Sequence, residues 1–101
     1  MSSAPVVLKF SGSLDAAAAK ALRPDLDELA QGARSDVVVD LSAVDFIDSS
    51  GIGAIVFLFK RLAARGHALR LRGVRGQPLR LMEFLRISRV IALEPSAEEA
   101  A

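Results

Sequence analysis

Two adjacent serines, with an acidic residue before them and glycines after them, form the part of this chain best suited to chemistry. The segment reads Asp48-Ser49-Ser50-Gly51-Ile52-Gly53. It joins a valine-rich run at residues 37–41, which predicts a buried strand, to an apolar pattern at residues 52–64, which predicts a helix. A helix N-terminus presents unpaired N–H groups and a partial positive charge, so it tolerates anions. A hydroxyl at this place can carry a phosphate, and the segment is therefore a candidate switch.

The remaining sequence predicts strands that alternate with helices. Strands are expected at residues 5–10, 37–41, 69–72 and 89–93. Helices are expected from an N-cap at Asp15 to about Gly32, from 52 to 64 and from Gln77-Pro78 onward, with a frayed or helical tail at 95–101. Pro24 should kink or restart the first helix. This alternation predicts an α/β fold in which the Ser49 segment lies at the carboxyl end of a central strand.

Helical spacing also assigns the faces of three predicted helices. The first should face the core with Leu22, Leu26 and Leu29, and the third with Leu79, Leu81, Met82 and Leu85. The second should bury Ile52, Ile55, Val56, Phe59, Leu62 and Ala63. Phe57 falls nearly opposite this last stripe, in company with Lys60 and Arg61. We hypothesise that these three residues bind a partner, the alternative being a second packing layer beneath the C-terminal tail.

Composition excludes several classes of protein. A chain of 101 residues predicts one domain, residues 1–101, and the absence of cysteine excludes disulfides and thiolate metal sites. The single histidine, His67, argues against a histidine-built metal site or catalytic triad. We therefore predict no cofactor and no metal. Without an apolar run of membrane-spanning length or a signal-peptide pattern, we expect a cytoplasmic protein that does not insert into membranes.

Charge is unevenly distributed along the chain. Residues 1–48 hold eight acidic and four basic residues, whereas residues 60–89 hold nine basic residues and one acid, Glu83. Such asymmetry can mark a nucleic-acid face, but no aromatic residues are interleaved to stack on bases. We favour a solvated surface without direct nucleic-acid binding, and retain a nucleic-acid-binding protein as a remote alternative.

Three segments together resemble the STAS-domain family, and within it the free-standing bacterial anti-sigma factor antagonists. They are Gly12-Ser13-Leu14-Asp15, Val37-Val38-Val39-Asp40-Leu41 and Phe46-Ile47-Asp48-Ser49-Ser50-Gly51-Ile52-Gly53, and the resemblance covers about residues 6–91. It implies a STAS-like fold, which is a mixed, mostly parallel β-sheet of about four strands flanked by helices. It also implies a non-enzymatic binding module of bacterial signal transduction and transcription regulation.

The resemblance further implies partner switching controlled by one hydroxyl. In that family an anti-sigma factor, which is also a serine kinase of the histidine-kinase-like ATPase type, phosphorylates the first hydroxyl of the loop. That position is Ser49 in this sequence. The unphosphorylated antagonist binds the kinase and frees the sigma factor, and a PP2C-type phosphatase resets the system.

Neighbouring residue types suit this role and also have structural explanations. Asp48 can orient the hydroxyl or accept hydrogen bonds in the loop, and Ser50 can be the helix N-cap. Gly51 and Gly53 leave space where a kinase backbone or nucleotide comes close. Asp15 matches an acidic residue that the family keeps near the loop, and it can equally be only a cap. The predicted partner-binding set is Asp15, Asp48, Ser50, Gly51, Gly53, Phe57, Lys60 and Arg61.

Two other functions compatible with this segment are a subunit of a lipid transporter and an enzyme. A related branch of the family forms the small cytoplasmic subunit of lipid-transport ABC systems, and its loop has a similar Asp-Ser-x-Gly core. An enzyme would use Ser49 or Ser50 as nucleophile and needs a nearby base. His67 should lie at the opposite end of the second helix, about 20 Å away at about 1.5 Å per residue. We therefore do not expect an enzyme.

Overall fold

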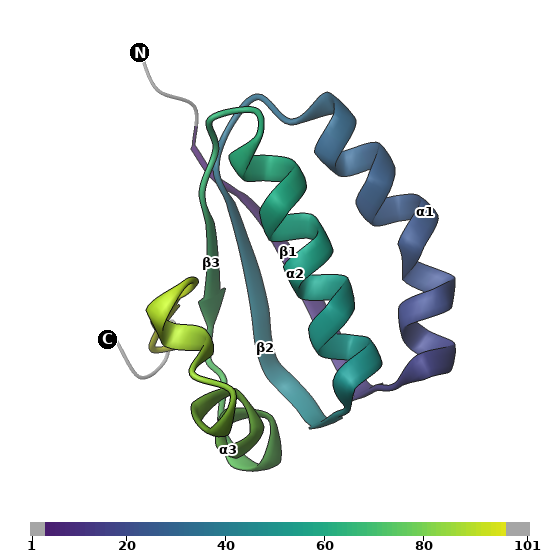
Figure 1. The fold of residues 1–101 in the computed structure, drawn as a ribbon, viewed down its shortest axis with the longest axis vertical. Coiled ribbons are helices and arrows are strands. Elements are labelled where there is room, and N and C mark those ends of the chain that lie inside the picture. Colours follow the sequence, from purple (N-terminus) through teal and green to yellow (C-terminus); the bar gives the residue numbers. More distant parts are fainter. Residues whose placement is uncertain (1–3, 97–101) are drawn as a thin grey trace.

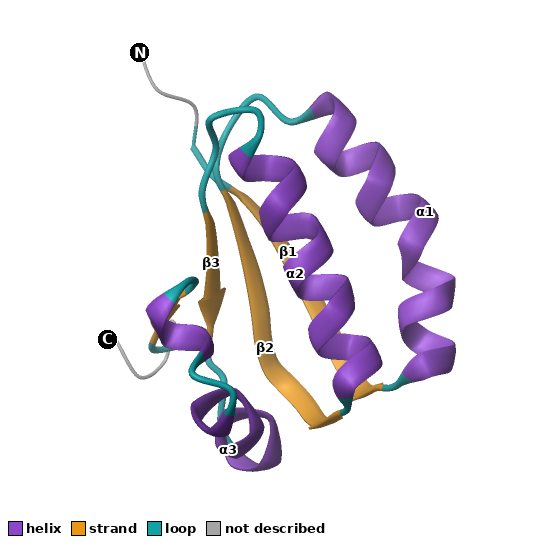
Figure 2. Ribbon diagram, in the orientation of Figure 1, coloured by secondary structure: helices purple, strands orange, loops and turns teal. Residues whose placement is uncertain are grey.

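Four strands and three α-helices alternate along residues 4–96, the part of the chain that the computed structural model describes (Figure 1). The strands are β1 (Val6–Leu14), β2 (Val37–Ile47), β3 (Leu69–Arg72) and β4 (Ala92–Glu94). The helices are α1 (Ala16–Gly32), α2 (Ser49–Ala63) and α3 (Gly76–Phe84), and a 3₁₀ turn, Ile87–Arg89, precedes β4 (Figure 2). The predicted α/β fold with a sheet of about four strands is confirmed.

The strands lie in chain order across the sheet, β1-β2-β3-β4, and each neighbouring pair is parallel. Parallel crossovers are right-handed, so strands in chain order place successive helices on the same face. Figure 1 shows α1 and α2 side by side in front of the sheet, with α3 at its lower end. Val39 and Leu41 of β2 and Leu58 of α2 are almost fully buried between these layers.

Both β1 and β2 are longer than the sequence pattern predicts. We expected them to end at residues 10 and 41, but they run to Leu14 and Ile47. Beyond the apolar residues the two strands continue to pair with each other, from Ser11↔Ala43 to Leu14↔Ile47, with two irregularities in register. Because this pairing extends past the hydrophobic run, backbone hydrogen bonds hold polar residues in the strands as well. The extension carries β2 directly to Asp48.

Helix α1 is continuous through Pro24 instead of restarting there. Its start at Asp15 and its end at Gly32 agree with the prediction. Leu26 is buried, and Leu22 and Leu29 are partly buried against the same core, as expected. Of the predicted kink or restart at Pro24, the restart is wrong, because the contacts of this apolar face outweigh the loss of one backbone hydrogen bond at the proline.

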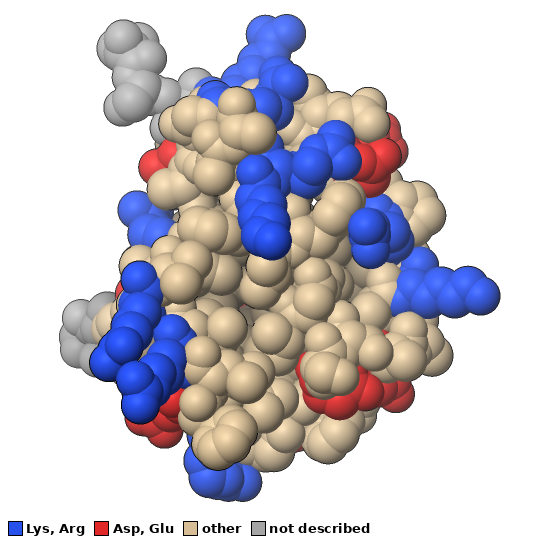
Figure 3. All heavy atoms as spheres, viewed as in Figure 1, with Lys and Arg blue, Asp and Glu red and all other residues tan. Residues whose placement is uncertain are grey.

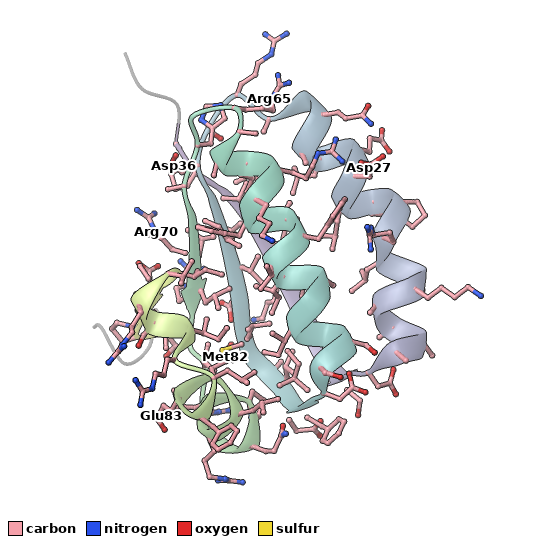
Figure 4. All side chains as sticks on the ribbon, viewed as in Figure 1. Asp27, Asp36, Arg65, Arg70, Met82 and Glu83 are labelled. Carbon is pink, nitrogen blue, oxygen red and sulfur yellow. The ribbon has the colours of Figure 1, made fainter. Side chains whose placement is uncertain are left out.

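Some predicted core positions are wrong. Ala63 and Leu85 are exposed, and Leu58, which the predicted stripe omitted, is almost fully buried. Met82 of α3 is buried as expected, and Figure 4 shows it on the side of α3 toward the sheet, with Glu83 pointing outward. The last strand begins later than residue 89 because the 3₁₀ turn occupies residues 87–89. The predicted tail at 95–101 lies outside the described residues from residue 97 onward.

Candidate functional site

Ser49 and Ser50 are the first two residues of α2, and both are exposed. The helix begins three residues before the predicted start at residue 52, so the serines belong to its first turn and not to a preceding loop. Within residues 4–96 the Ser49 hydroxyl has no hydrogen-bond partner. Its oxygen is therefore open to an external reactant.

Asp48 is the N-cap of α2. Its carboxylate accepts hydrogen bonds from the backbone N–H groups of Ser50 at 2.9 Å and Gly51 at 3.1 Å. The Asp48 carbonyl also accepts the Ile52 N–H at 3.0 Å. The prediction that Ser50 is the cap is wrong, because the helix already begins at Ser49 and the Asp48 carboxylate, two residues before Ser50, binds the N–H groups of its first turn.

This cap changes the electrostatics expected at Ser49. A phosphate on a helix N-terminus is normally stabilised by unpaired N–H groups. Here the Ser50 and Gly51 N–H groups are already bound by Asp48. A phosphoryl group on Ser49 would stand beside a carboxylate and compete with it for the same donors, so its negative charge would remain available to repel a partner.

A second acidic cap lies at the end of the neighbouring strand. The Asp15 carboxylate accepts the Ala18 N–H at 3.0 Å and caps α1. Leu14 and Ile47 are paired in register, so Asp15 and Asp48 follow equivalent positions of adjacent strands. The Asp48 N–H also donates to the Leu14 carbonyl at 3.4 Å. The carboxyl edge of the sheet therefore brings Asp15, Asp48 and Ser49 together.

The two glycines of the segment have different surroundings. Gly51 is buried, and a Cβ added there would overlap the Leu14 carbonyl oxygen and the Ile47 side chain. The space beside Gly51 is filled by the end of β1, not left for a partner, which corrects the sequence-based explanation. Gly53 is exposed, and a Cβ there would meet nothing within 4 Å. Gly53 alone leaves open surface next to the serines.

The helical pattern predicted Phe57 on a solvent face, but the structure does not place it there. It is partly buried against the core, and the Arg23 guanidinium of α1 lies 3.7 Å from its ring centroid. Arg61 is 5.4 Å from the same centroid and forms an ion pair with Asp27 of α1. The prediction failed because α1 packs along that side of α2. Within residues 4–96 the layer that packs on Phe57 is helix α1. Of the three residues predicted to contact a partner here, Lys60 is exposed.

Gln77, predicted from the sequence only to begin a helix, is hydrogen-bonded to Ile47, the residue before Asp48. Its side-chain oxygen accepts the Ile47 N–H at 2.9 Å, and its side-chain nitrogen donates to the Ile47 carbonyl at 2.8 Å. The two residues are 30 positions apart. No local pattern in the sequence predicts a contact of this range.

The other groups considered from the sequence lie away from Ser49. His67 follows the C-terminal end of α2, whereas Ser49 begins that helix. Cavities of about 340 Å³ lie beside Arg75 and between β1 and α1, and neither is lined by Ser49. Among residues 4–96 no cluster of three His, Asp or Glu residues has the geometry to hold a metal ion. No helix in this range has the length and hydropathy needed to cross a bilayer.

Basic side chains form separate groups on the face drawn in Figure 3, with acidic residues beside some of them. Several arginines of the basic half are paired: Arg70 with Glu94 at 3.5 Å and Arg72 with Asp40 at 3.4 Å. The Ser42 hydroxyl, bonded to Asp40 at 2.6 Å, is the main cause that lowers the pKa of Asp40. Burial opposes it, and the Ser42 N–H and Arg72 lower the pKa further. These pairings favour a solvated surface.

Known proteins are similar to this chain over most of its length. The STAS domain family model matches residues 2–100. The anti-sigma-B factor antagonist of Bacillus subtilis (strain 168) is 30% identical over 94 residues, covering 92% of this chain and 84% of that protein.

Solved structures share the fold. The Bacillus anti-sigma factor antagonist SpoIIAA in its unphosphorylated form has a TM-score of 0.74 at 22% identity over 93% of this chain and 82% of that one. Its phosphorylated form has a TM-score of 0.71 at 23% identity over 93% and 85%. A sulfate transporter family protein from Wolinella succinogenes has a TM-score of 0.77 at 17% identity over 94% and 80%.

Proposed function

This chain belongs to the STAS domain family, and on that premise we propose that it is an anti-sigma factor antagonist controlled by phosphorylation of Ser49. The observation that carries the proposal is the Ser49 hydroxyl, exposed and without a partner in the described chain, at the start of a capped helix. A kinase needs such an accessible oxygen as its acceptor. The curated relative, an anti-sigma-B factor antagonist, supports the partner class.

In this proposal the partner is an anti-sigma factor that is also a serine kinase of the histidine-kinase-like ATPase type. A PP2C-type phosphatase removes the phosphate, and the whole cycle takes place in the cytoplasm. The antagonist itself contributes binding and a phosphate acceptor, and it catalyses no reaction. Its contact surface surrounds Ser49 and includes Asp15, Asp48, Ser50, Gly53 and Lys60.

Charge explains how phosphorylation would release the partner. A phosphoserine adds about −1.5 to −2 charges at pH 7. On Ser49 this charge would stand beside Asp48, whose carboxylate already binds the nearest helix N–H groups. The edge of the sheet would then present a dense negative charge at a surface built to fit the neutral hydroxyl. An unpaired charge buried at an interface costs about 2–5 kcal/mol, which corresponds to a loss of about 30-fold or more in affinity.

Ser50 provides the matched control because it is also an exposed serine in the first turn of α2. The purified protein is incubated with ATP and its cognate anti-sigma factor kinase, and phosphopeptides are mapped by mass spectrometry. Ser49→Ala should abolish phosphorylation and retain kinase binding, whereas Ser50→Ala should retain both. Phosphate on Ser50 alone would reverse the assignment of the acceptor. No phosphate on either serine, with co-purification of a transporter ATPase, would instead place the chain in the lipid-transport branch.

A further inference from the structure

The end of β2 lacks a strand neighbour on the side toward β3. β1 pairs with β2 from Val37 to Ile47, but β3 pairs only with residues Val37–Asp40 of β2. The last residue, Ile47, is fully buried and stands two positions before Ser49. A buried backbone N–H and carbonyl need hydrogen-bond partners, and at Ile47 the sheet does not supply them on this side.

The Gln77 side chain supplies both partners. Its amide accepts the Ile47 N–H at 2.9 Å and donates to the Ile47 carbonyl at 2.8 Å, so it replaces the backbone of a missing strand residue. On the other side, the Asp48 N–H reaches the Leu14 carbonyl of β1 at 3.4 Å. The shorter bonds at Gln77 therefore hold the chain where it turns from β2 into α2.

Gln77 is itself held in place by its helix. It lies in the first turn of α3, next to Pro78, and both Pro78 and Met82 of this helix are buried. The amide is therefore fixed to a packed element and not to a mobile loop. Its two hydrogen bonds therefore fix the backbone of Ile47, where the chain begins to turn toward Ser49, relative to α3.

We propose that Gln77 is a positioning residue for the Ser49 switch, because it fixes both hydrogen-bonding groups of Ile47 and so sets where the Ser49 hydroxyl lies. The inference rests on the proposed function, since it concerns the phosphorylation of Ser49. Two residues span about 7 Å of extended chain, so a tilt of about 10° at Ile47 moves the hydroxyl by about 1 Å. A displacement of about 1 Å from the reactive geometry can cost about 100-fold in rate.

The test compares Gln77→Ala with Gln31→Ala. Gln31 is also a helix glutamine, but its amide bonds only the exposed Asp27 side chain, at 3.1 Å. Steady-state phosphorylation of Ser49 by the cognate anti-sigma factor kinase gives kcat and KM for each variant. Amide hydrogen exchange at Ile47 reports the hydrogen bond itself, with the Val39 amide in the centre of the sheet as the reference for global unfolding.

We expect Gln77→Ala to lower kcat by about tenfold or more with KM within about twofold, because the reacting hydroxyl moves while the contact surface remains. Ile47 exchange should rise about fivefold, the factor that one net hydrogen bond corresponds to, with Val39 unchanged. Gln31→Ala should match the wild type. A second variant, Gln77→Glu, keeps the acceptor for the Ile47 N–H and loses the donor to its carbonyl. It should protect the Ile47 amide and still lower kcat.

The outcomes separate this inference from the proposed function. Phosphorylation of the wild type with unchanged kcat in Gln77→Ala would overturn the role of Gln77 and leave the switch at Ser49 intact. If kcat and the exchange protection of the Val39 amide fall by the same factor in Gln77→Ala, the variant is generally less stable, and this too would overturn the positioning role of Gln77. A wild type that accepts no phosphate at Ser49 would overturn the proposed function, and the positioning role with it.

Discussion

Removing the Asp48 side chain should destabilise the protein through the start of α2. In Asp48→Ala two backbone N–H groups, those of Ser50 and Gly51, lose their acceptor. Replacing an N-cap by alanine costs about 0.5–2 kcal/mol, and we expect about 1.5 kcal/mol here because two donors are affected. For a domain of this size, that corresponds to a fall in Tm of about 6–12 °C.

Two further variants separate capping from charge. Asp48→Asn retains an acceptor oxygen and a good capping residue, so its loss of stability should be only a few tenths of a kcal/mol. Asp15→Ala removes the acceptor of a single N–H, that of Ala18, and should cost about 1 kcal/mol. The assay is urea unfolding followed by circular dichroism at pH 7. Equal stability of Asp48→Ala and the wild type, or an equal loss in Asp48→Asn and Asp48→Ala, would refute the assignment of Asp48 as the cap.

Three other substitutions test the packing and the charges. Gly51→Ala places a methyl group against the carbonyl at the end of β1 and should lower the free energy of unfolding by about 3 kcal/mol. Gly53→Ala should be neutral or slightly stabilising. Equal urea midpoints for the two variants would contradict this difference. Phe57→Ala should lower the free energy of unfolding by about 2 kcal/mol, because the ring packs against the core beneath Arg23. An unchanged urea midpoint would show instead that Phe57 lies on a solvent face. Asp40 has a lowered pKa, so it contributes stability above its unfolded pKa of about 3.9 that is lost as the pH falls through its native pKa. Asp40→Asn should therefore be less stable than the wild type at pH 7, with a smaller difference at pH 3, and a difference that grows in acid would contradict the lowered pKa.

The parts of the fold that local signals determine were predictable from the sequence. Asp15 before an alanine-rich run predicts a cap, and the structure shows its carboxylate on the Ala18 N–H. Alternating leucines and arginines predict β3, in which Leu69 and Leu71 are buried. Period and capping chemistry act within a few residues, so one sequence suffices to find them.

Features that depend on a neighbour were not predictable in the same way. The ends of β1 and β2 are set by their mutual pairing and not by their own hydrophobicity. Phe57 lies opposite the apolar stripe of its helix, yet α1 covers it there. The sequence suggested Ser50 as the cap and Asp48 as an acceptor in the loop, and only the backbone geometry shows that Asp48 is the cap. The contact of Gln77 with Ile47 spans 30 residues and has no local signal.

The most direct test of the switch at Ser49 is the affinity of two forms of this protein for the cognate anti-sigma factor. Phosphoserine is incorporated at position 49 during translation. Isothermal titration calorimetry then measures Kd for this form and for the unmodified chain, in the presence of a non-hydrolysable ATP analogue so that no phosphate is transferred during the titration. We predict that the phosphorylated form binds at least about 30-fold more weakly, the equivalent of about 2 kcal/mol, while both forms remain folded. Equal Kd values for the two folded forms would contradict the proposal that phosphorylation of Ser49 controls binding.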